Sequence, residues 1–231
     1  MSGGTDELAI ELREVTRRMG GEYVLRGVNL EVAAGRLVVL RGSNGTGKTT
    51  LLRLLATRLR PAGGQAFVFG HDLTRDGAAA RARLGLLSVM GGSFPLLTGR
   101  ENLELAAALA PGPREGAPRS DMAAGGAGFE GPLAGVGLEQ AADKLVRTYS
   151  SGMKKRLGLA RLLLLDPDLW LLDEPYAALD DLGKRLMDEC VTAAKARGRT
   201  VFMASHESDR DHLGPDAVIE LRGGTLRMFG A

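Results

Sequence analysis

The chain is short of cysteine, of charge excess and of long apolar runs, and each shortage narrows its class. Its only cysteine, Cys190, cannot form a disulfide within the chain, which fits a reducing cytoplasm. The 30 Lys and Arg residues against 28 Asp and Glu leave a net charge of +2, so the bulk charge favours neither nucleic acid nor an anionic membrane surface. We therefore expect any partner to be recognised through local sites.

No segment has the character of a targeting sequence or a membrane span. The opening residues, MSGGTDELAIELREV, carry acidic side chains where a signal peptide carries basic ones before an apolar core. The most apolar stretch, LGLARLLLLDPDLWLL, is interrupted at Arg161, Asp166, Pro167 and Asp168. Since about 18 consecutive apolar residues are needed to cross a bilayer, the sequence predicts no transmembrane helix.

Alternating apolar patterns predict a single α/β domain over residues 1–231. Residues 8–41 have the pattern of short strands separated by turns, and a helix follows from Gly47 up to Pro61. Later strands are predicted at LWLLDEP and TVFMAS, with a helix at 181–197 between them and a terminal hairpin in AVIELRGGTLRMFG. Strands that alternate with helices predict a mostly parallel sheet with both faces covered.

The texture changes between residues 81 and 146. The segment RENLELAAALA has a helical pattern. Residues 111–136 are so rich in Ala, Gly and Pro that we expect a loop or a poorly ordered insert there.

The segment GSNGTGKT, residues 42–49, matches the phosphate-binding pattern G-x-x-x-x-G-K-[ST] between a predicted strand and a predicted helix. Its glycines let the backbone curl so that N–H groups and the helix N-terminus form a nest for anionic oxygens. Lys48 is expected to reach the β- and γ-phosphates, and the Thr49 hydroxyl to ligate magnesium. The other loop positions expected to bind the nucleotide are Gly42, Ser43, Asn44, Gly45, Thr46, Gly47 and Thr50.

Three polar residues follow later predicted strands. Asp173, at the end of LWLLDEP, is placed to hold magnesium through water, and Glu174 is placed to orient a water aimed at the γ-phosphate. His206 closes the strand VFMASH, and strand ends in a parallel sheet open toward one crevice, so its imidazole is expected to bond a phosphate oxygen. Lys48, Glu174 and His206 are therefore the predicted catalytic residues.

The segment RTYSSGMKKRLGLAR, residues 147–161, places two serines and a glycine at the start of a basic helix. Ser150, with the backbone of Ser151 and Gly152, presents hydrogen-bond donors at a helix N-terminus, which suits an anion. Capping by the serine and packing of the apolar positions are expected as well.

In this order and spacing, GSNGTGKT, YSSGM, LWLLDEP, ALD and SH resemble the ATP-binding cassette (ABC) ATPases over nearly the whole chain. The resemblance implies a P-loop NTPase of ABC type, with a mostly parallel sheet core, an N-terminal antiparallel β subdomain and an α-helical sub-lobe. It assigns residues 1–80 to the β subdomain and P-loop core, 81–146 to the sub-lobe with its flexible insert, and 147–231 to the signature helix and remaining core.

The resemblance also implies a magnesium-dependent ATPase whose nucleotide is ATP. In this family two cassettes dimerise head to tail, so that the signature helix of one, here Ser150, Ser151 and Gly152, covers the γ-phosphate held by the other. Asp180, in ALD, resembles the residue that links the two sites. The sub-lobe is implied to rest on an integral membrane permease subunit. We expect a cytoplasmic homodimer, peripheral on the inner face of the plasma membrane, with no nucleic acid partner.

The chain departs from the family pattern at three places. The signature is usually L-S-G-G-Q and here differs at Tyr149, Ser151 and Met153. Val89 stands where a lobe-joining, magnesium-sensing glutamine is usual, which predicts altered coupling or hydrolysis. The aromatic residue that stacks on adenine aligns near Met19, and Tyr23 is close enough to take its place.

Because the chain is one bare cassette, we expect the ATPase subunit of a transporter that powers export through a separate membrane subunit. The segments YSSGMKKRLGLARLLL and MASHESDR resemble the haem exporter of cytochrome c maturation, and also small drug or polysaccharide export cassettes. The alternatives are soluble cassettes of DNA repair or translation, and a nucleotide-gated binding module with little turnover. Glu174 argues against the last, because a switch that never hydrolyses needs no base.

Overall fold

The computed structural model describes residues 7–88, 92–110, 129–205 and 212–229. The chain forms two compact units. The first holds Met1–Leu86, Asp168–Glu174 and Val191–Ala231, and the second holds Leu87–Pro167 and Pro175–Cys190. Among the described residues, no helix combines the length and the apolar character that a bilayer span requires.

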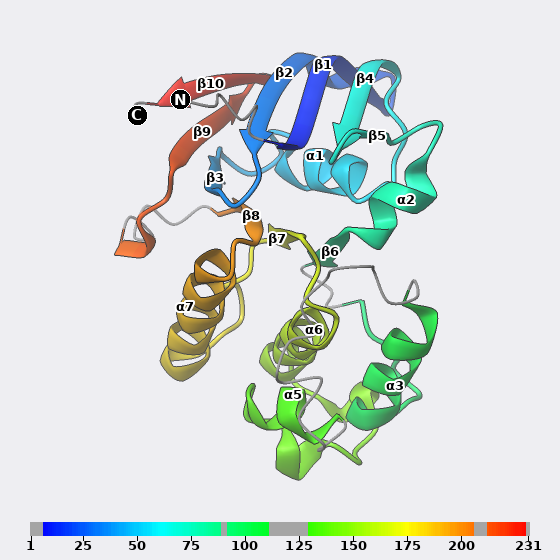
Figure 1. The fold of residues 1–231 in the computed structure, drawn as a ribbon, viewed down its shortest axis with the longest axis vertical. Coiled ribbons are helices and arrows are strands. Elements are labelled where there is room, and N and C mark those ends of the chain that lie inside the picture. Colours follow the sequence, from blue (N-terminus) through cyan, green and yellow to red (C-terminus); the bar gives the residue numbers. More distant parts are fainter. Residues whose placement is uncertain (1–6, 89–91, 111–128, 206–211, 230–231) are drawn as a thin grey trace, which may run out of the picture. The chain divides into compact units, whose positions relative to one another are not determined.

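An antiparallel sheet forms the N-terminal part of the first unit, as predicted. Its strands lie in the order β2-β1-β4-β5, with the bounds β1 Leu8–Met19, β2 Glu22–Ala33, β4 Gly63–Val68 and β5 His71–Asp72. The pairing of β1 with β2 shifts register around Glu14, whose φ of 51° marks a bulge. Figure 1 shows helix α1, Lys48–Leu55, lying against this sheet.

A second sheet is mostly parallel, and several of its strands end at the predicted site. Its strands lie in the order β10-β9-β3-β8-β7-β6. Their bounds are β3 Leu37–Arg41, β6 Leu84–Leu87, β7 Leu169–Asp173, β8 Thr200–Ala204, β9 Ala217–Arg222 and β10 Thr225–Phe229. The neighbours β9, β3, β8 and β7 run parallel, and β10 returns antiparallel as the predicted terminal hairpin. The strands β7 and β8 are buried along their whole length, which explains their continuous apolar sequences.

Two helices of the first unit follow the strands closely. Helix α1 ends at Leu55, earlier than the predicted stop at Pro61, because Thr57 adopts a left-handed φ of 57°. A short helix α2, Gly77–Ala82, leads into β6. The leucines of α1 join the buried faces of both sheets in one core. The start of α1 follows β3 through the loop of residues 42–47.

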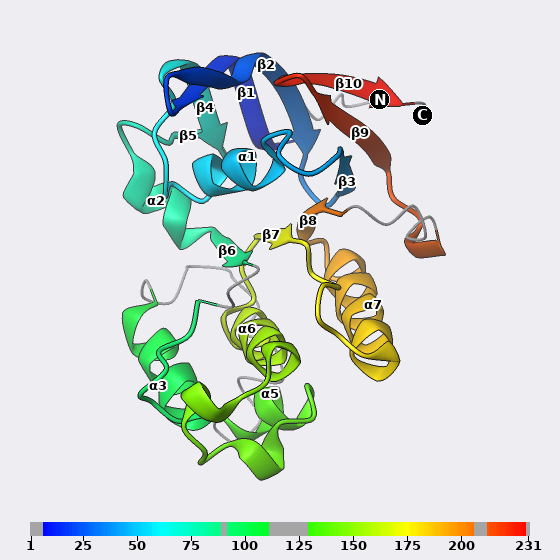
Figure 2. The same cartoon turned by 180° about the vertical axis from the view of Figure 1, so that it is seen from behind.

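Helices build the second unit. They are α3 Gly99–Leu109, α5 Glu130–Ala134, α6 Ser151–Leu165 and α7 Asp181–Ala196, of which the part up to Cys190 belongs to this unit. Single 3₁₀ turns lie at Glu139–Ala141 and Val146–Thr148. Helix α6 packs against α3 and α5, as Figure 2 shows. The bounds of this helical unit differ from those predicted for the sub-lobe, residues 81–146. The unit includes α6, because α6 packs against α3 and α5.

The predicted insert is shorter than expected at its C-terminal side. Residues 111–128 lie outside the described residues, but Glu130–Ala134 form helix α5 instead of a loop. Pro132 is tolerated because it stands in the first helical turn, where its missing N–H has no partner to lose. The helix is stabilised by burial of Leu133, and of Val136 just beyond it.

Candidate nucleotide-binding site

The loop of residues 42–49 connects β3 to α1 in the first unit, with its glycines in backbone conformations that side chains disfavour. Gly42 has a φ of 152° and Gly47 a φ of 108°. A Cβ on Gly42 would lie 2.7 Å from the carbonyl oxygen of Leu221, and one on Gly47 would lie 2.8 Å from Cγ1 of Val24. The loop therefore curls against its neighbours in a form that only glycine permits at these two positions.

Lys48, the first residue of α1, turns back over this loop. Its Nζ donates to the carbonyl oxygen of Gly42 at 2.7 Å and to that of Ser43 at 3.3 Å. The same Nζ lies 3.6 Å from Oε1 of Glu174. A buried ammonium group, 6% exposed, thus stands between loop carbonyls and a carboxylate.

Thr49 and Asp173 lie beside each other. The hydroxyl of Thr49 donates to Oδ1 of Asp173 at 3.0 Å. Asp173 ends the buried strand β7 and is 2% exposed. The order β3-β8-β7 brings the ends of these strands to one edge of the sheet, so the two residues meet although 124 positions separate them.

Glu174 has an unusual backbone. Its φ of 49° is left-handed, and its N–H donates to the carbonyl oxygen of Ala204 at 3.0 Å. Such a conformation is unfavourable for a residue with a side chain, and at functional sites it commonly persists because neighbours enforce it. The turn directs the carboxylate toward Lys48.

His206 and Val89 lie outside the described residues. Ser205, just before His206, is buried and donates its N–H to the carbonyl oxygen of Leu40 at 3.1 Å. The chain therefore leaves β8 beside β3, the strand that leads into the glycine-rich loop.

The tip of α6, in the second unit, has the capped start that the sequence predicts. Ser150 is the N-cap, and its Oγ accepts a hydrogen bond from the N–H of Met153 at 3.2 Å. Ser150 and Ser151 are exposed. Their polar groups are thus open to a partner outside this unit.

Tyr149, just before this tip, holds the preceding segment in place by a hydrogen bond to Ala141, a role that sequence analysis missed. The buried Tyr149 hydroxyl donates to the carbonyl oxygen of Ala141 at 2.6 Å, and burial raises the pKa of Tyr149. Gly99, the first residue of α3, lies against the hydroxyl so closely that a Cβ there would overlap it. A tyrosine in place of the usual signature leucine was a signal for such a bond.

A second tyrosine fastens the segment around Asp180, and it was missed as well. Oδ1 of Asp180 accepts the N–H of Gly183 at 2.8 Å, as an N-cap of α7 does. The buried hydroxyl of Tyr176 donates to Oδ1 of Asp188 at 2.6 Å. The signal in the sequence was one aromatic residue among the small residues of YAALD.

The end of the β1–β2 hairpin exposes both residues considered for base contact. Met19 and Tyr23 are 45% and 43% exposed. The Arg18 guanidinium lies 4.3 Å from the centre of the Tyr23 ring, so one face of this ring is covered. Val24 lies against Gly47, which brings this end of β2 next to the loop.

Comparison with known proteins places these features in a family. The ABC transporter family model matches residues 25–177. The daunorubicin resistance ATP-binding protein DrrA3 of Streptomyces coeruleorubidus is 37% identical over 200 residues, which cover 86% of this chain and 60% of that protein. The cytochrome c biogenesis ATP-binding export protein CcmA 2 of Cupriavidus metallidurans is 33% identical over 201 residues, with coverage of 87% and 90%.

The chain spans 65% or less of the length of the daunorubicin-resistance relatives. Among solved structures, the ATP-binding subunit of an ABC transporter superposes with a TM-score of 0.84 at 25% identity, covering 96% of this chain and 90% of that one. An ATP-binding cassette captured as a dimer after hydrolysis, with ADP and Pi bound, gives 0.80 at 26% identity, with coverage of 95% and 97%. These matches confirm the predicted fold class. The chain belongs to the ABC transporter family.

Proposed function

We propose that this chain binds and hydrolyses ATP to power export through a separate membrane subunit. The observation that carries the proposal is the joining of two pairs at one edge of the sheet: Lys48 with Glu174, and Thr49 with Asp173. Phosphoryl transfer to water requires a cation for the phosphates, ligands for a metal ion and a carboxylate that activates the water. Lys48, the pair of Thr49 and Asp173, and Glu174 would supply them in turn.

The residues present fit a magnesium ion. Mg²⁺ prefers hard oxygen ligands and binds through one or two carboxylates together with phosphate oxygens and water. The Thr49 hydroxyl and the Asp173 carboxylate, 3.0 Å apart, supply such ligands beside the glycine-rich loop. When bound, the ion would neutralise charge on the β- and γ-phosphates.

The protein's own groups have distinct tasks in this proposal. Lys48 exchanges its bonds to the Gly42 and Ser43 carbonyl oxygens for the β- and γ-phosphate oxygens. The Glu174 carboxylate then accepts a proton from the attacking water and orients it in line with the leaving group. His206 donates a hydrogen bond to the γ-phosphate; its support is the exit of β8 beside β3.

A second copy of the chain completes the site. Ser150, Ser151 and Gly152 of that copy supply donors at a helix N-terminus to the γ-phosphate, and Asp180 links the two sites. The exposure of both serines supports this role. Two bound ATP molecules close the dimer, and hydrolysis of ATP reopens it.

We assign the adenine contact to Met19 rather than Tyr23. Arg18 already covers one face of the Tyr23 ring, whereas Met19 stands exposed at the hairpin end. A thioether packs well on an aromatic face, so Met19 supplies an apolar support for the base.

The second unit offers an apolar groove for the membrane subunit. Its hollow of about 260 Å³ lies between α3 and α6, and the most exposed apolar residues that line it are Phe94 (54% exposed), Leu109 (71%) and Leu165 (38%). These exposed apolar side chains make the groove a candidate contact for a protein or membrane partner. We propose that an apolar segment of an integral membrane subunit rests there, which would hold the chain on the cytoplasmic face of the membrane.

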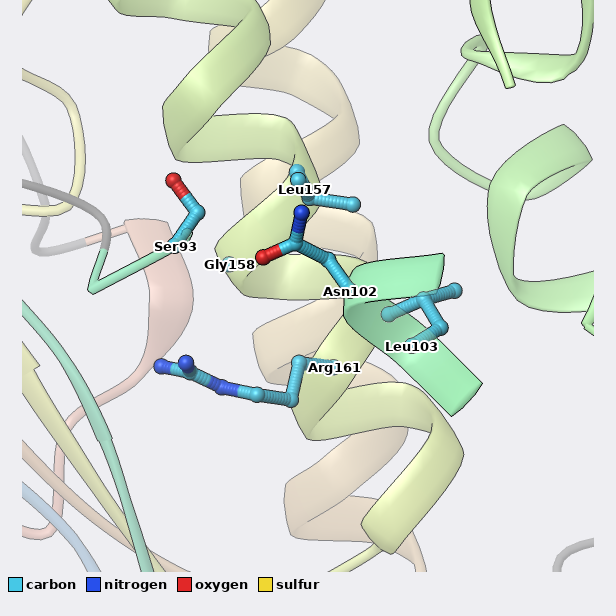
Figure 3. A pocket seen from close by; sticks show the side chains of 6 residues that line it. All are labelled: Ser93, Asn102, Leu103, Leu157, Gly158 and Arg161. Carbon is cyan, nitrogen blue, oxygen red and sulfur yellow. The ribbon is translucent and has the colours of Figure 1, made fainter. Parts of the chain in front are cut away.

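The groove is rigid on one side. Buried Asn102 accepts the N–H of Phe94 at 2.7 Å and donates to the carbonyl oxygens of Phe94 and Thr98, at 3.1 and 2.8 Å. Arg161 donates to the carbonyl oxygen of Gly92 at 2.7 Å. Figure 3 shows Asn102 between α3 and α6, and Arg161 reaching toward the segment of Ser93. Phe94 is thus held in place before any partner arrives.

For the cargo we propose haem, on the resemblance of YSSGMKKRLGLARLLL to the haem exporter of cytochrome c maturation. Relatives named for export of fluoroquinolones and transport of bacitracin make small drugs the alternative. Stimulation of ATP hydrolysis in the purified transporter by haem, and not by anthracyclines or fluoroquinolones, would support haem. Stimulation only by the drugs would refute it.

The function itself is tested with Glu174→Gln. This change keeps the shape of the side chain but removes the base, so the variant should bind ATP, fail to hydrolyse it and accumulate as a dimer. Size-exclusion chromatography with light scattering at saturating ATP and Mg²⁺ measures the dimer. A Glu174→Gln chain that stays monomeric, or that hydrolyses ATP at the wild-type rate, would show that the proposed function is wrong.

A further inference from the structure

Two segments of the second unit meet the partner copy's nucleotide in the proposed function, on which this inference rests. One is the tip of α6, Ser150–Gly152, and the other is the loop of residues 175–180. This loop follows Glu174 of the first unit directly, yet it clusters with α6 in the second unit. Physical contacts within the second unit must therefore hold it there.

The first contact joins the two segments by their backbones. A Cβ on Gly152 would lie 2.8 Å from the carbonyl oxygen of Ala178, so no side chain fits between the tip and the loop. Ala178 has a left-handed φ of 65°, which turns its carbonyl toward Gly152 at a conformational cost. The loop thus needs support from elsewhere to keep this shape.

Tyr176 supplies that support. Its hydroxyl donates to Oδ1 of Asp188 at 2.6 Å, and the side chain is 3% exposed. At the other end of the loop, Asp180 accepts the N–H of Gly183 at 2.8 Å. Ala178 therefore lies between two points at which the loop is attached to α7.

We propose that Tyr176 is a positioning residue for ATP hydrolysis. Its bond to Asp188 holds Ala178 against Gly152, so that the chain presents Ser150 and Asp180 to the second copy as one rigid surface. Tyr176 contacts no reacting atom. It acts on the step in which the partner's site is completed, whereas capture of ATP by Lys48 and its loop does not depend on it.

The test uses Tyr176→Phe, which removes only the hydroxyl. The Kd for ATP should stay at the wild-type value, and kcat should fall about fivefold, as the loss of one hydrogen bond predicts. Asp188→Asn keeps the acceptor oxygen and should retain most of kcat, while Asp188→Ala should match Tyr176→Phe. A wild-type kcat in both Tyr176→Phe and Asp188→Ala would overturn the proposal.

Hydrogen exchange of the nucleotide-free chain separates positioning from local support. In Tyr176→Phe, amide exchange should become faster in a peptide covering residues 176–190 and also in one covering 146–156. Faster exchange confined to 176–190 would mean that the loop is not coupled to the tip of α6, which overturns the proposal.

The same variant added to Glu174→Gln distinguishes this inference from the proposed function. If Glu174→Gln dimerises in ATP and the added Tyr176→Phe raises the ATP concentration needed about fivefold, both are supported. An unchanged requirement for ATP overturns the role of Tyr176 alone. A Glu174→Gln chain that never dimerises overturns both.

Discussion

Nζ of Lys48 lies 3.6 Å from Oε1 of Glu174, although the two residues come from the start of α1 and the end of β7. Both groups are largely buried, so the charge of each is balanced by the other and by the neighbouring polar atoms. A nucleotide that bonds to Lys48 therefore also changes the surroundings of the carboxylate. In the proposed function, ATP binding and water activation therefore depend on the same pair of side chains.

Replacement of Lys48 should weaken nucleotide binding. Lys48→Ala eliminates the cation for the β- and γ-phosphates, and affinity for ATP should fall about 10- to 100-fold, the range for hydrogen bonds to charged groups. Titration with a fluorescent ATP analogue measures the Kd. Lys144→Ala, which removes an exposed lysine, is the control and should bind as the wild type does. Equal affinities in the two variants would contradict the role of Lys48.

The signature tip should matter for turnover and not for capture. Ser150→Arg places a bulky side chain on an exposed position at the helix N-terminus, so ATP should bind with normal affinity while hydrolysis stops. Steady-state phosphate release and the ATP Kd provide the two readouts. Ser150→Thr retains the capping oxygen and should preserve the fold. Normal turnover in Ser150→Arg would reduce this tip to a structural helix start.

An aromatic residue at position 19 should improve base binding. Stacking of a base on an aromatic ring contributes about 1–3 kcal/mol, more than a thioether supplies, so Met19→Tyr should lower the Kd for ATP at least several-fold. Met19→Ala should raise it, and Tyr23→Ala should leave it unchanged. If Tyr23→Ala weakens binding while the Met19 variants do not, the base contact belongs to Tyr23.

The apolar groove should be needed for membrane association only. Leu109→Asp introduces a charge on a residue that is 71% exposed, so the fold and the ATP Kd should be preserved. The fraction that sediments with membranes, and co-purification of an integral membrane protein, should both drop. Leu182→Asp, on an exposed residue of α7, is the matched control. Undiminished association of Leu109→Asp would mean that the partner binds elsewhere.

Acid should weaken the first unit through Asp216. Burial alone would raise the pKa of Asp216, but the Leu37 N–H at 2.8 Å, Lys195 at 3.1 Å and Arg36 at 3.4 Å outweigh it and lower the pKa. Because the folded pKa lies below the unfolded one, the stabilisation is present above about pH 4 and is lost as the pH falls through the folded pKa.

Asp216→Asn tests this relation by urea unfolding across pH. The variant should be less stable by about 1 kcal/mol at pH 7 and should lose less further stability below pH 4. Glu189→Gln, which removes an exposed carboxylate of α7, is the control for the loss of one negative charge. Parallel pH profiles for wild type and Asp216→Asn would exclude Asp216 as a source of acid sensitivity.

Sequence patterns predict the sheet core well because its information is local. The run LVVLR and the run LWLLD are continuous apolar segments, as strands buried on both faces must be. Parallel strands then carry their end residues to one edge, so a meeting of Thr49 with Asp173 follows from order along the chain. The structure places these two oxygens 3.0 Å apart.

The hydrogen bonds of Tyr149 and Tyr176 could not be predicted from local sequence patterns. Tyr149 bonds a carbonyl oxygen in the turn before it, and Tyr176 bonds Asp188, and in both cases the partner is chosen by how the helices of the second unit pack. Helix α5 was hidden for a related reason. Its Gly and Pro favour a loop, and the burial of Leu133 and Val136 outweighs that local preference.

Gly99 lies against the Tyr149 hydroxyl, so a substitution at position 99 and one at position 149 are tolerated in one order but not in the other. Alanine at position 99 would collide with the hydroxyl oxygen of Tyr149, whereas leucine at position 149 would leave space that Gly99 tolerates. Descendants of this protein should therefore lose the tyrosine before the glycine, and the reverse intermediate should be rare. Such dependence between neighbouring changes is epistasis that arises from steric contact.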